Sequence, residues 1–246
     1  METAFRTQKF DAADILGQSV QLIKLGAARL FPIAILSAIP QCILLYYNQS
    51  LPISDDPEVM FSTLGTTCGL SLVMSVISLY AYIAAVFTVE ALVQGRPDGV
   101  LAAFRFALSR LLPVLLVFFV FMILTMLGMA ILVIPGIILA IYLAFAIPAA
   151  ALRNLNLPAL EYSHKLVQGQ WWRVFGILLG IGLLTGITTS LLNWIGGALF
   201  PVLGFGMILF YFLTSLVTFF FAVPYMVFFL NEDYRAHPLP AAPVEG

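Results

Sequence analysis

Residues 111–152 read LLPVLLVFFVFMILTMLGMAILVIPGIILAIYLAFAIPAAAL, and these 42 residues contain no charged side chain. As one α-helix the stretch would be about 63 Å long, whereas the hydrocarbon core of a bilayer is about 30 Å thick. The segment must therefore fold back on itself, and Pro135-Gly136 near its middle is a suitable place for the turn. This predicts two membrane-spanning helices joined by a short connection.

The composition of the whole chain agrees with a membrane protein. Hydrophobic residues make up 62% of the 246 and charged residues only 9%, against about 25% charged in a soluble domain. A net charge of -1 leaves no basic surface for nucleic acid, so nucleic-acid binding is excluded. The polar residues 1–9 do not resemble a cleavable signal peptide, and we expect the first span to act as an uncleaved insertion signal.

Three further uncharged runs predict the remaining spans. Leu30 to Ser54 and Val59 to Val89 each hold one span, and the 57 residues from Val174 to Leu230 hold two. The break in this last run is predicted at a cluster of polar, small and proline residues: Asn193, Trp194, Gly196, Gly197 and Pro201. The total is six spans.

The positive charges fix the orientation. With six spans, all 11 Lys and Arg fall on one side, whereas the charged residues of the loop from Asn48 to Glu58 are all acidic. The positive-inside rule then places the basic side, and with it both termini, in the cytoplasm. The basic residues are Arg6, Lys9, Lys24, Arg29, Arg96, Arg105, Arg110, Arg153, Lys165, Arg173 and Arg235.

Each pair of spans follows a short amphipathic stretch, which predicts a cytoplasmic helix in the plane of the membrane. These stretches begin near Asp11, at a cap on Asp98, and near Pro158. Each enters the membrane through an arginine: Arg29-Leu30-Phe31-Pro32, Arg110-Leu111-Leu112-Pro113 and Arg173-Val174-Phe175-Gly176. The predicted fold class is an all-α integral membrane protein of six transmembrane helices as three hairpins, each preceded by an in-plane amphipathic cytoplasmic helix.

The domain organisation follows from these units. We expect a single membrane domain over residues 1–230, with repeat units at about 10–93, 98–152 and 156–230. The alternative is chance similarity among apolar segments. Residues 231–246 are short and rich in Pro and Ala, which predicts a disordered cytoplasmic tail.

The sequence also resembles a known family in one region. Ile134 to Ala140 (IPGIILA), Pro148, and residues 159–173 (ALEYSHKLVQGQWWR) are similar to the YciC-like bacterial inner-membrane proteins. That group resembles the membrane domain attached to some glycerophosphodiester phosphodiesterases. The resemblance covers roughly Ile131 to Gly180 and implies a multi-pass protein of the bacterial inner membrane, with no catalytic residue to carry over. Because the chain ends at Gly246, we expect no phosphodiesterase activity.

Four residues are candidates for functional roles. Arg29, Arg110 and Arg173 would lie at one depth, where a guanidinium can bind a lipid phosphate through two hydrogen bonds. The alternative is that they only anchor the topology. Convergence of the three would favour a lipid site. Glu90 is a candidate functional intramembrane carboxylate, unless it is hydrated or paired with an arginine.

Two tryptophans and two cysteines have predicted structural roles. Trp171 and Trp172 are predicted interface anchors. Cys42 and Cys68 form no disulfide framework, although a single bond between them is possible.

Reaction chemistry is weakly represented. Gly69-Leu70-Ser71 has a serine-nucleophile pattern, but no span contains a histidine to act as base. Glu161 and His164 have the spacing of a metal-ligand pair without a second copy, and an exposed Glu161–Lys165 ion pair is the simpler interpretation. We expect no enzyme, no metal and no cofactor.

Small and hydroxyl residues leave two questions open. Gly65 and Gly69, and similarly spaced glycines from Gly176 to Gly186, permit close helix packing, either within one molecule or in a homo-oligomer. Thr185, Thr188, Thr189 and Ser190 either line a path through the fifth span or bond to their own helix carbonyls.

The leading hypothesis is a non-enzymatic membrane protein that binds or organises phospholipid at the cytoplasmic leaflet, or scaffolds membrane partners in envelope homeostasis. The alternative is a small transporter or channel component. A membrane enzyme ranks third, because the sequence shows no cluster of reactive residues.

Overall fold

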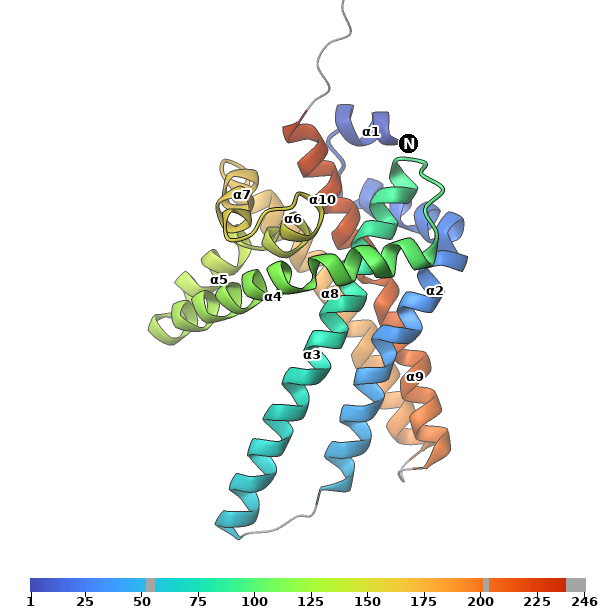
Figure 1. The fold of residues 1–246 in the computed structure, drawn as a ribbon, viewed down its shortest axis with the longest axis vertical. Helices are drawn as coiled ribbons and strands as arrows, with labels where there is room; N and C mark the ends of the chain where they lie inside the picture. The colour runs from blue at the N-terminus through green and yellow to red at the C-terminus, as the bar shows by residue number, and fades with distance from the viewer. Residues whose placement is uncertain (52–55, 201–203, 238–246) are drawn as a thin grey trace, which may run out of the picture.

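The computed structural model describes residues 1–51, 56–200 and 204–237. Within these residues the fold consists of α-helices and contains no strand (Figure 1). The helices are α1 (Glu2–Thr7), α2 (Ala12–Ser50), α3 (Pro57–Val93), α4 (Val100–Ile131), α5 (Val133–Tyr142), α6 (Ala146–Leu152), α7 (Pro158–Val167), α8 (Trp171–Leu199), α9 (Phe205–Phe220) and α10 (Ala222–Ala236).

Six segments of the described chain are long and apolar enough to cross a membrane. Four of them are the single helices α2, α3, α4 and α8, and the other two, Val133–Leu152 and Gly206–Ala236, each comprise two consecutive helices. The prediction of an all-helical, multi-pass membrane protein is confirmed.

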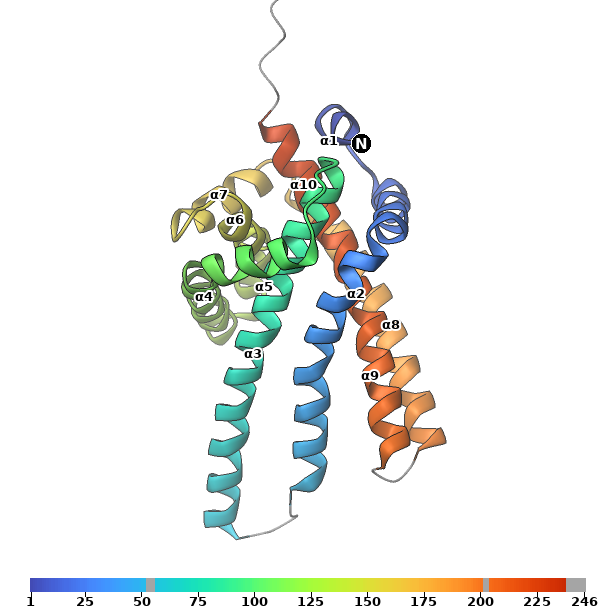
Figure 2. The ribbon, with the colours of Figure 1, turned by 45° about the vertical axis from the view of Figure 1, so that its right-hand side comes forward.

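The in-plane stretches differ from the prediction. Only the third, α7, is a separate helix, because Gly169 adopts a φ of +83° and interrupts the chain before α8. The first two continue without a break into α2 and α4, and Pro32 and Pro113 lie inside those helices. Proline in a long helix bends it rather than ending it when neighbouring groups satisfy the freed carbonyl. Figure 2 shows that the first part of α2 bends away from the direction of the rest.

The predicted caps and turns are close to the observed ones. Asp11 caps α2 by accepting a hydrogen bond from the Asp14 amide, but the cap residue of α4 is Gly99 and not Asp98. Asp98 pairs instead with Arg96 at 3.0 Å. The break between α4 and α5 falls at Leu132, three residues before the predicted Pro135-Gly136.

Gly136 nevertheless has a structural role at this turn. A Cβ there would lie 2.6 Å from the backbone nitrogen of Met129, so only glycine lets α5 pack this closely on α4. The last predicted break also shifts, because α8 continues through Asn193 and Gly197 to Leu199. Pro201 lies outside the described residues.

Consecutive long helices pack together as pairs, α2 on α3, α4 on α5, and α8 on α9, with α2 also packed along α9. Figures 1 and 2 show α2, α3, α8 and α9 running roughly in one direction, whereas α4 and α5 lie crosswise to them. The three pairs are therefore not arranged alike about a common axis.

Most of the basic residues lie in elements that gather at one end of the molecule, which we call the charged end. It comprises α1, the first part of α2, the connections 94–99 and 153–157, α7, the start of α8 and the end of α10 (Figure 1). The main buried cluster also lies there and includes Phe5, Ile83, Phe145 and Phe228. The opposite halves of the long helices are much less buried: only 6% of the most apolar window of α8 is buried in the structure.

The predicted domain boundary after Leu230 is wrong. Helix α10 continues to Ala236, and Asn231 to Tyr234 are all buried. The boundary was placed there because the uncharged run ends at Leu230, yet buried acidic residues extend a helix when they find partners inside the protein. Residues 238–246 of the predicted tail lie outside the described residues.

The predicted glycine ridges do not pack within the molecule. A Cβ added at Gly65, Gly69, Gly176, Gly180, Gly182 or Gly186 would meet no atom within 4 Å. The interpretation of these ridges as contacts within one molecule is therefore wrong, and their role in a homo-oligomer stays a prediction.

Candidate functional site

Four consecutive buried polar residues of α10, Asn231 to Tyr234, organise the charged end. Asn231 is fully buried and fastens the N-terminal segment to α10. Its side-chain oxygen accepts a hydrogen bond from the Phe10 amide at 3.1 Å, and its nitrogen donates to the carbonyls of Phe5 and Gln8 at 3.0 and 2.9 Å. The end of α10, which was predicted to belong to a tail from residue 231 onward, thus holds the two ends of the described chain together.

Arg153, which follows α6, bridges two buried carboxylates. Its Nη1 lies 2.9 Å from Glu90 Oε1, and its Nε donates to Asp233 Oδ2 at 2.9 Å. Glu90 has a second cation, Arg96, at 3.8 Å, and Asp233 also accepts a hydrogen bond from Tyr162. Arg153 therefore links α3 to α10, and α7 joins them through the hydrogen bond from Tyr162 to Asp233.

Glu232 forms the second ion pair of the cluster, with Arg173. Gln170 donates to Glu232 Oε2 at 2.6 Å, and Arg173 Nη2 donates to the Phe10 carbonyl at 2.6 Å. The Glu232 side chain is only 3% exposed, so this arginine compensates a buried charge.

The electrostatics of the cluster fix the protonation states of Arg153 and Tyr162. Burial alone would lower the pKa of Arg153, but the hydrogen bond with Asp233 and the charges of Asp233 and Glu90 raise that pKa above its usual value. Burial, followed by the hydrogen bond to Asp233 and the charge of Asp233, raises the pKa of Tyr162 well above its usual value. At neutral pH Arg153 is therefore a cation and Tyr162 a neutral hydrogen-bond donor.

The three boundary arginines do not share a site in the structure. Arg173 pairs with Glu232, Arg29 donates to the carbonyl of Arg96 at 3.1 Å, and Arg110 donates to the side chain of Asn154. The convergence that would favour a joint phosphate site is therefore not observed, because each guanidinium has its own protein partner. Arg29 and Arg110 donate hydrogen bonds to uncharged oxygens, so no carboxylate of the described residues compensates their positive charges.

The other predicted positions have mixed outcomes. Glu90 is paired with arginine, which agrees with the alternative interpretation of this residue. Trp172 is 77% exposed at the start of α8, while Trp171 stacks on Phe175 with ring centroids 5.3 Å apart. Their role as interface anchors stays a prediction.

The simpler interpretations of three motifs agree with the structure. Glu161 pairs with Lys165 at 2.7 Å, and this contact lowers the pKa of Glu161. Thr185 and Thr189 donate to carbonyls of their own helix at 2.8 Å. Cys42 and Cys68 are not bonded to each other.

Sequence reasoning missed the charged cluster, although a signal for it was present. Each returning segment, α3, α5–α6 and α9–α10, ends in an ionisable residue on the basic side: Glu90, Arg153 and Glu232–Asp233. Residues at one depth can pair across a bundle, so this coincidence of depth predicts a network.

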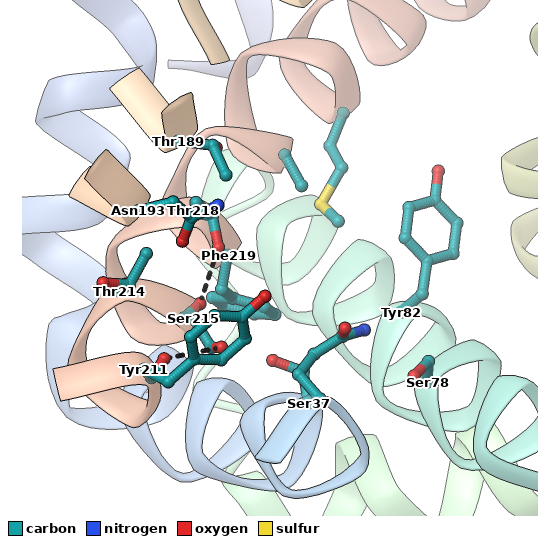
Figure 3. Close-up of a pocket in the computed structure, with 13 residues that line it drawn as sticks. Ser37, Ser78, Tyr82, Thr189, Asn193, Tyr211, Thr214, Ser215, Thr218 and Phe219 are labelled. Carbon is teal, nitrogen blue, oxygen red and sulfur yellow. Dashed lines mark hydrogen bonds between the residues drawn. The ribbon is translucent and has the colours of Figure 1, made fainter. Parts of the chain in front are cut away.

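A second polar feature lies between the long helices, away from the charged end. It is a cavity of about 290 Å³ whose wall is rich in hydroxyl and amide groups and contains no charged residue (Figure 3). Its polar lining residues are Ser37 and Gln41 of α2, Ser78 and Tyr82 of α3, Thr189 and Asn193 of α8, and Tyr211, Thr214, Ser215 and Thr218 of α9. Of the four hydroxyl residues singled out in the fifth span, only Thr189 lines it.

The chain matches no protein-family model, no curated protein and no solved structure. Its class is thus defined by its own architecture, an all-helical multi-pass membrane protein with six candidate spans. The resemblance to the YciC-like group stays a prediction.

Proposed function

We propose that this chain is a non-enzymatic integral protein of the bacterial inner membrane that binds and organises anionic phospholipid in the cytoplasmic leaflet. The crosswise position of the α4–α5 hairpin near the charged end carries the proposal (Figures 1 and 2). If the four long helices cross the membrane, this apolar hairpin lies within the cytoplasmic leaflet, because only 11% of the most apolar window of α4 is buried by protein. A hairpin in that position displaces lipid from one leaflet only.

The start of α4 has the surface expected of a helix at a lipid interface. Leu101, Leu108 and Leu112 are 63%, 67% and 76% exposed and follow one another at helical spacing, with the exposed Arg105 among them. Within the described residues, no acidic side chain pairs with Arg105, Arg110 or Arg29. Leucines that face acyl chains and arginines that face phosphates fit one phospholipid layer.

An apolar hollow provides a place for an acyl chain. It has a volume of about 600 Å³ and lies between α5 and the start of α8, where Ile134, Ile138, Trp171 and Trp172 contribute to its wall. Apolar side chains supply nearly all of this surface, which suits a hydrocarbon tail.

Native mass spectrometry of the protein released in mild detergent tests the proposal. The wild type should retain anionic phospholipid, and the combined Arg29→Gln, Arg105→Gln and Arg110→Gln variant should bind it about 100-fold more weakly, since each interfacial cation contributes about 1 kcal/mol. Lys165→Gln is the matched control, because this exposed cation already pairs with Glu161. Arg173 is left intact, since its loss would remove the nearest cation of the buried Glu232, which would keep only Arg235 at 3.4 Å.

Two outcomes would contradict the proposal. Equal lipid retention by the triple variant and by Lys165→Gln would show that these arginines serve only as topology anchors. A wild-type protein that carries no lipid but a second membrane protein would favour scaffolding of partners instead.

A small transporter or channel component is a second candidate function, and the uncharged cavity favours it. The cavity lies among candidate spans, where many transporters hold their substrate sites. Flux of small solutes into proteoliposomes, compared with protein-free vesicles, tests this function. Absence of flux over a broad set of solutes would exclude it.

A further inference from the structure

We propose that the cavity between α2, α3, α8 and α9 is a binding site for a small uncharged polyhydroxylated solute. Figure 3 shows side chains from all four helices around it, with Asn193 and Thr189 of α8 facing the hydroxyls of α9 and with Ser37, Ser78 and Tyr82 on the other helices. The inference depends on neither candidate function, because a solute can bind here whether or not phospholipid binds at the charged end.

The depth of the cavity makes its polar wall unusual. Gln41 lies twelve residues after Arg29, and Tyr82 lies eight residues before Glu90, which corresponds to about 18 and 12 Å along their helices. Both positions fall inside a hydrocarbon core of about 30 Å. Polar side chains at such depth are costly unless they have partners, and they commonly line a substrate path or a water-filled space.

The hydrogen-bonding capacity of the wall suits hydroxyl groups. Ser37, Thr189, Ser215 and Thr218 donate their protons to carbonyls of their own helices over 2.8 to 3.0 Å, so their oxygens remain as acceptors toward the cavity. The amides of Gln41 and Asn193 add donors. A wall with both donors and acceptors matches a hydroxyl group, which is itself both.

Tyr82 forms part of the wall, but its hydroxyl is not free for a ligand. The hydroxyl is buried against the hydroxyl of Tyr225 on α10, which itself donates to the carbonyl of Ala144. The residue also lines a neighbouring cavity of about 410 Å³, so it forms part of the wall between the two spaces. The groups that remain for a bound molecule are the amides of Gln41 and Asn193 and the acceptor oxygens of the wall.

Charge and size limit the class of ligand. Because no charged side chain lines the cavity, a charged molecule would be held there without a counter-ion, which is strongly unfavourable. The volume of about 290 Å³ has room for a small molecule. A small neutral polyol meets both conditions.

Xylitol and glycerol phosphate are matched probes for this site, since both have ten non-hydrogen atoms and only the second is charged. Saturation-transfer NMR of the full chain in nanodiscs should show saturable xylitol binding and no binding of glycerol phosphate. Combined replacement of Gln41 and Asn193 by Leu should weaken xylitol binding by tenfold or more, and Asn193→Leu alone by roughly threefold to tenfold. Thr185→Val is the control, because this hydroxyl makes the same local bond on α8 but does not line the cavity.

The result that overturns the inference is equally direct. Folded wild-type protein, judged by its elution and helicity, that binds no xylitol, or that binds glycerol phosphate as well as xylitol, excludes a polyol site. Equal loss of binding in Thr185→Val and Asn193→Leu also excludes it. Asn193 is exposed on α8, so the single Asn193→Leu variant keeps the test decisive even if the double variant fails to fold.

Discussion

Replacement of Arg153 by Met should be among the most destabilising single changes at the charged end. The guanidinium compensates Glu90 and Asp233, whose side chains are 7% and 2% exposed. Removal of one partner from a buried ion pair costs about 3–5 kcal/mol. Arg153 is itself 29% exposed and Glu90 keeps Arg96 at 3.8 Å, so we expect the lower end, about 3 kcal/mol. For a chain of this length that is about 6–12 °C in melting temperature.

Thermal unfolding in detergent measures this effect, with Lys165→Met as the matched control. Lys165 forms an ion pair of its own, but its side chain is 68% exposed, and an exposed pair contributes less than about 1 kcal/mol. A second change, Asp233→Asn, should restore more than half of the stability lost in Arg153→Met, because Asp233 is the carboxylate left without a cation, whereas Glu90 keeps Arg96. Equal melting temperatures for Arg153→Met and Lys165→Met would refute the electrostatic account of the cluster.

Three further predictions test the hairpin and the protonation of the cluster. Gly136→Ala should destabilise the chain by about 1–3 kcal/mol in thermal unfolding, because its Cβ would strike backbone of α4, whereas Gly186→Ala meets nothing within 4 Å and should be neutral. Because the pKa of Tyr162 is raised in the folded state, the stability it contributes is complete below about pH 10 and is lost above it, so the difference in stability between wild type and Tyr162→Phe should shrink there. In a cysteine-free background, Ile131→Cys should resist an impermeant maleimide from both sides if the hairpin lies in the cytoplasmic leaflet, while Glu58→Cys should react from outside.

The sequence allowed the membrane class to be predicted because hydrophobicity is a local property. An uncharged apolar run of 42 residues is too long and too apolar for a soluble surface, so it predicts membrane helices. Residues elsewhere in the chain do not change this prediction. The direction of a helix is not local in this sense. The apolar pattern of residues 111–152 is the same whether the pair crosses the membrane or lies across its neighbours, and the packing on α3 and α6 decides between the two.

The boundary of α10 shows a second limit of local reasoning. Asn231, Glu232 and Asp233 are polar and follow an apolar run, and sequence alone assigns such residues to solvent. Their burial depends on Phe10, Arg173 and Arg153, which lie 59 to 221 residues away along the chain. Phe10 contributes a backbone amide, which no side-chain pattern reveals. Partners at such separations become visible only when the helices are placed together.

One physical requirement explains both polar regions and separates their roles. In lipid a polar group needs a partner, and at the charged end the protein supplies one: Glu90, Glu232 and Asp233 each have an arginine. That cluster is therefore complete as it stands and has a structural role in holding α3, α8 and α10 together. The cavity has a different character, since its wall combines uncharged donors and acceptors and contains no ion pair. A molecule that bonds to these groups comes from outside the chain, and a neutral molecule suits them because no counter-ion is present for a charged one.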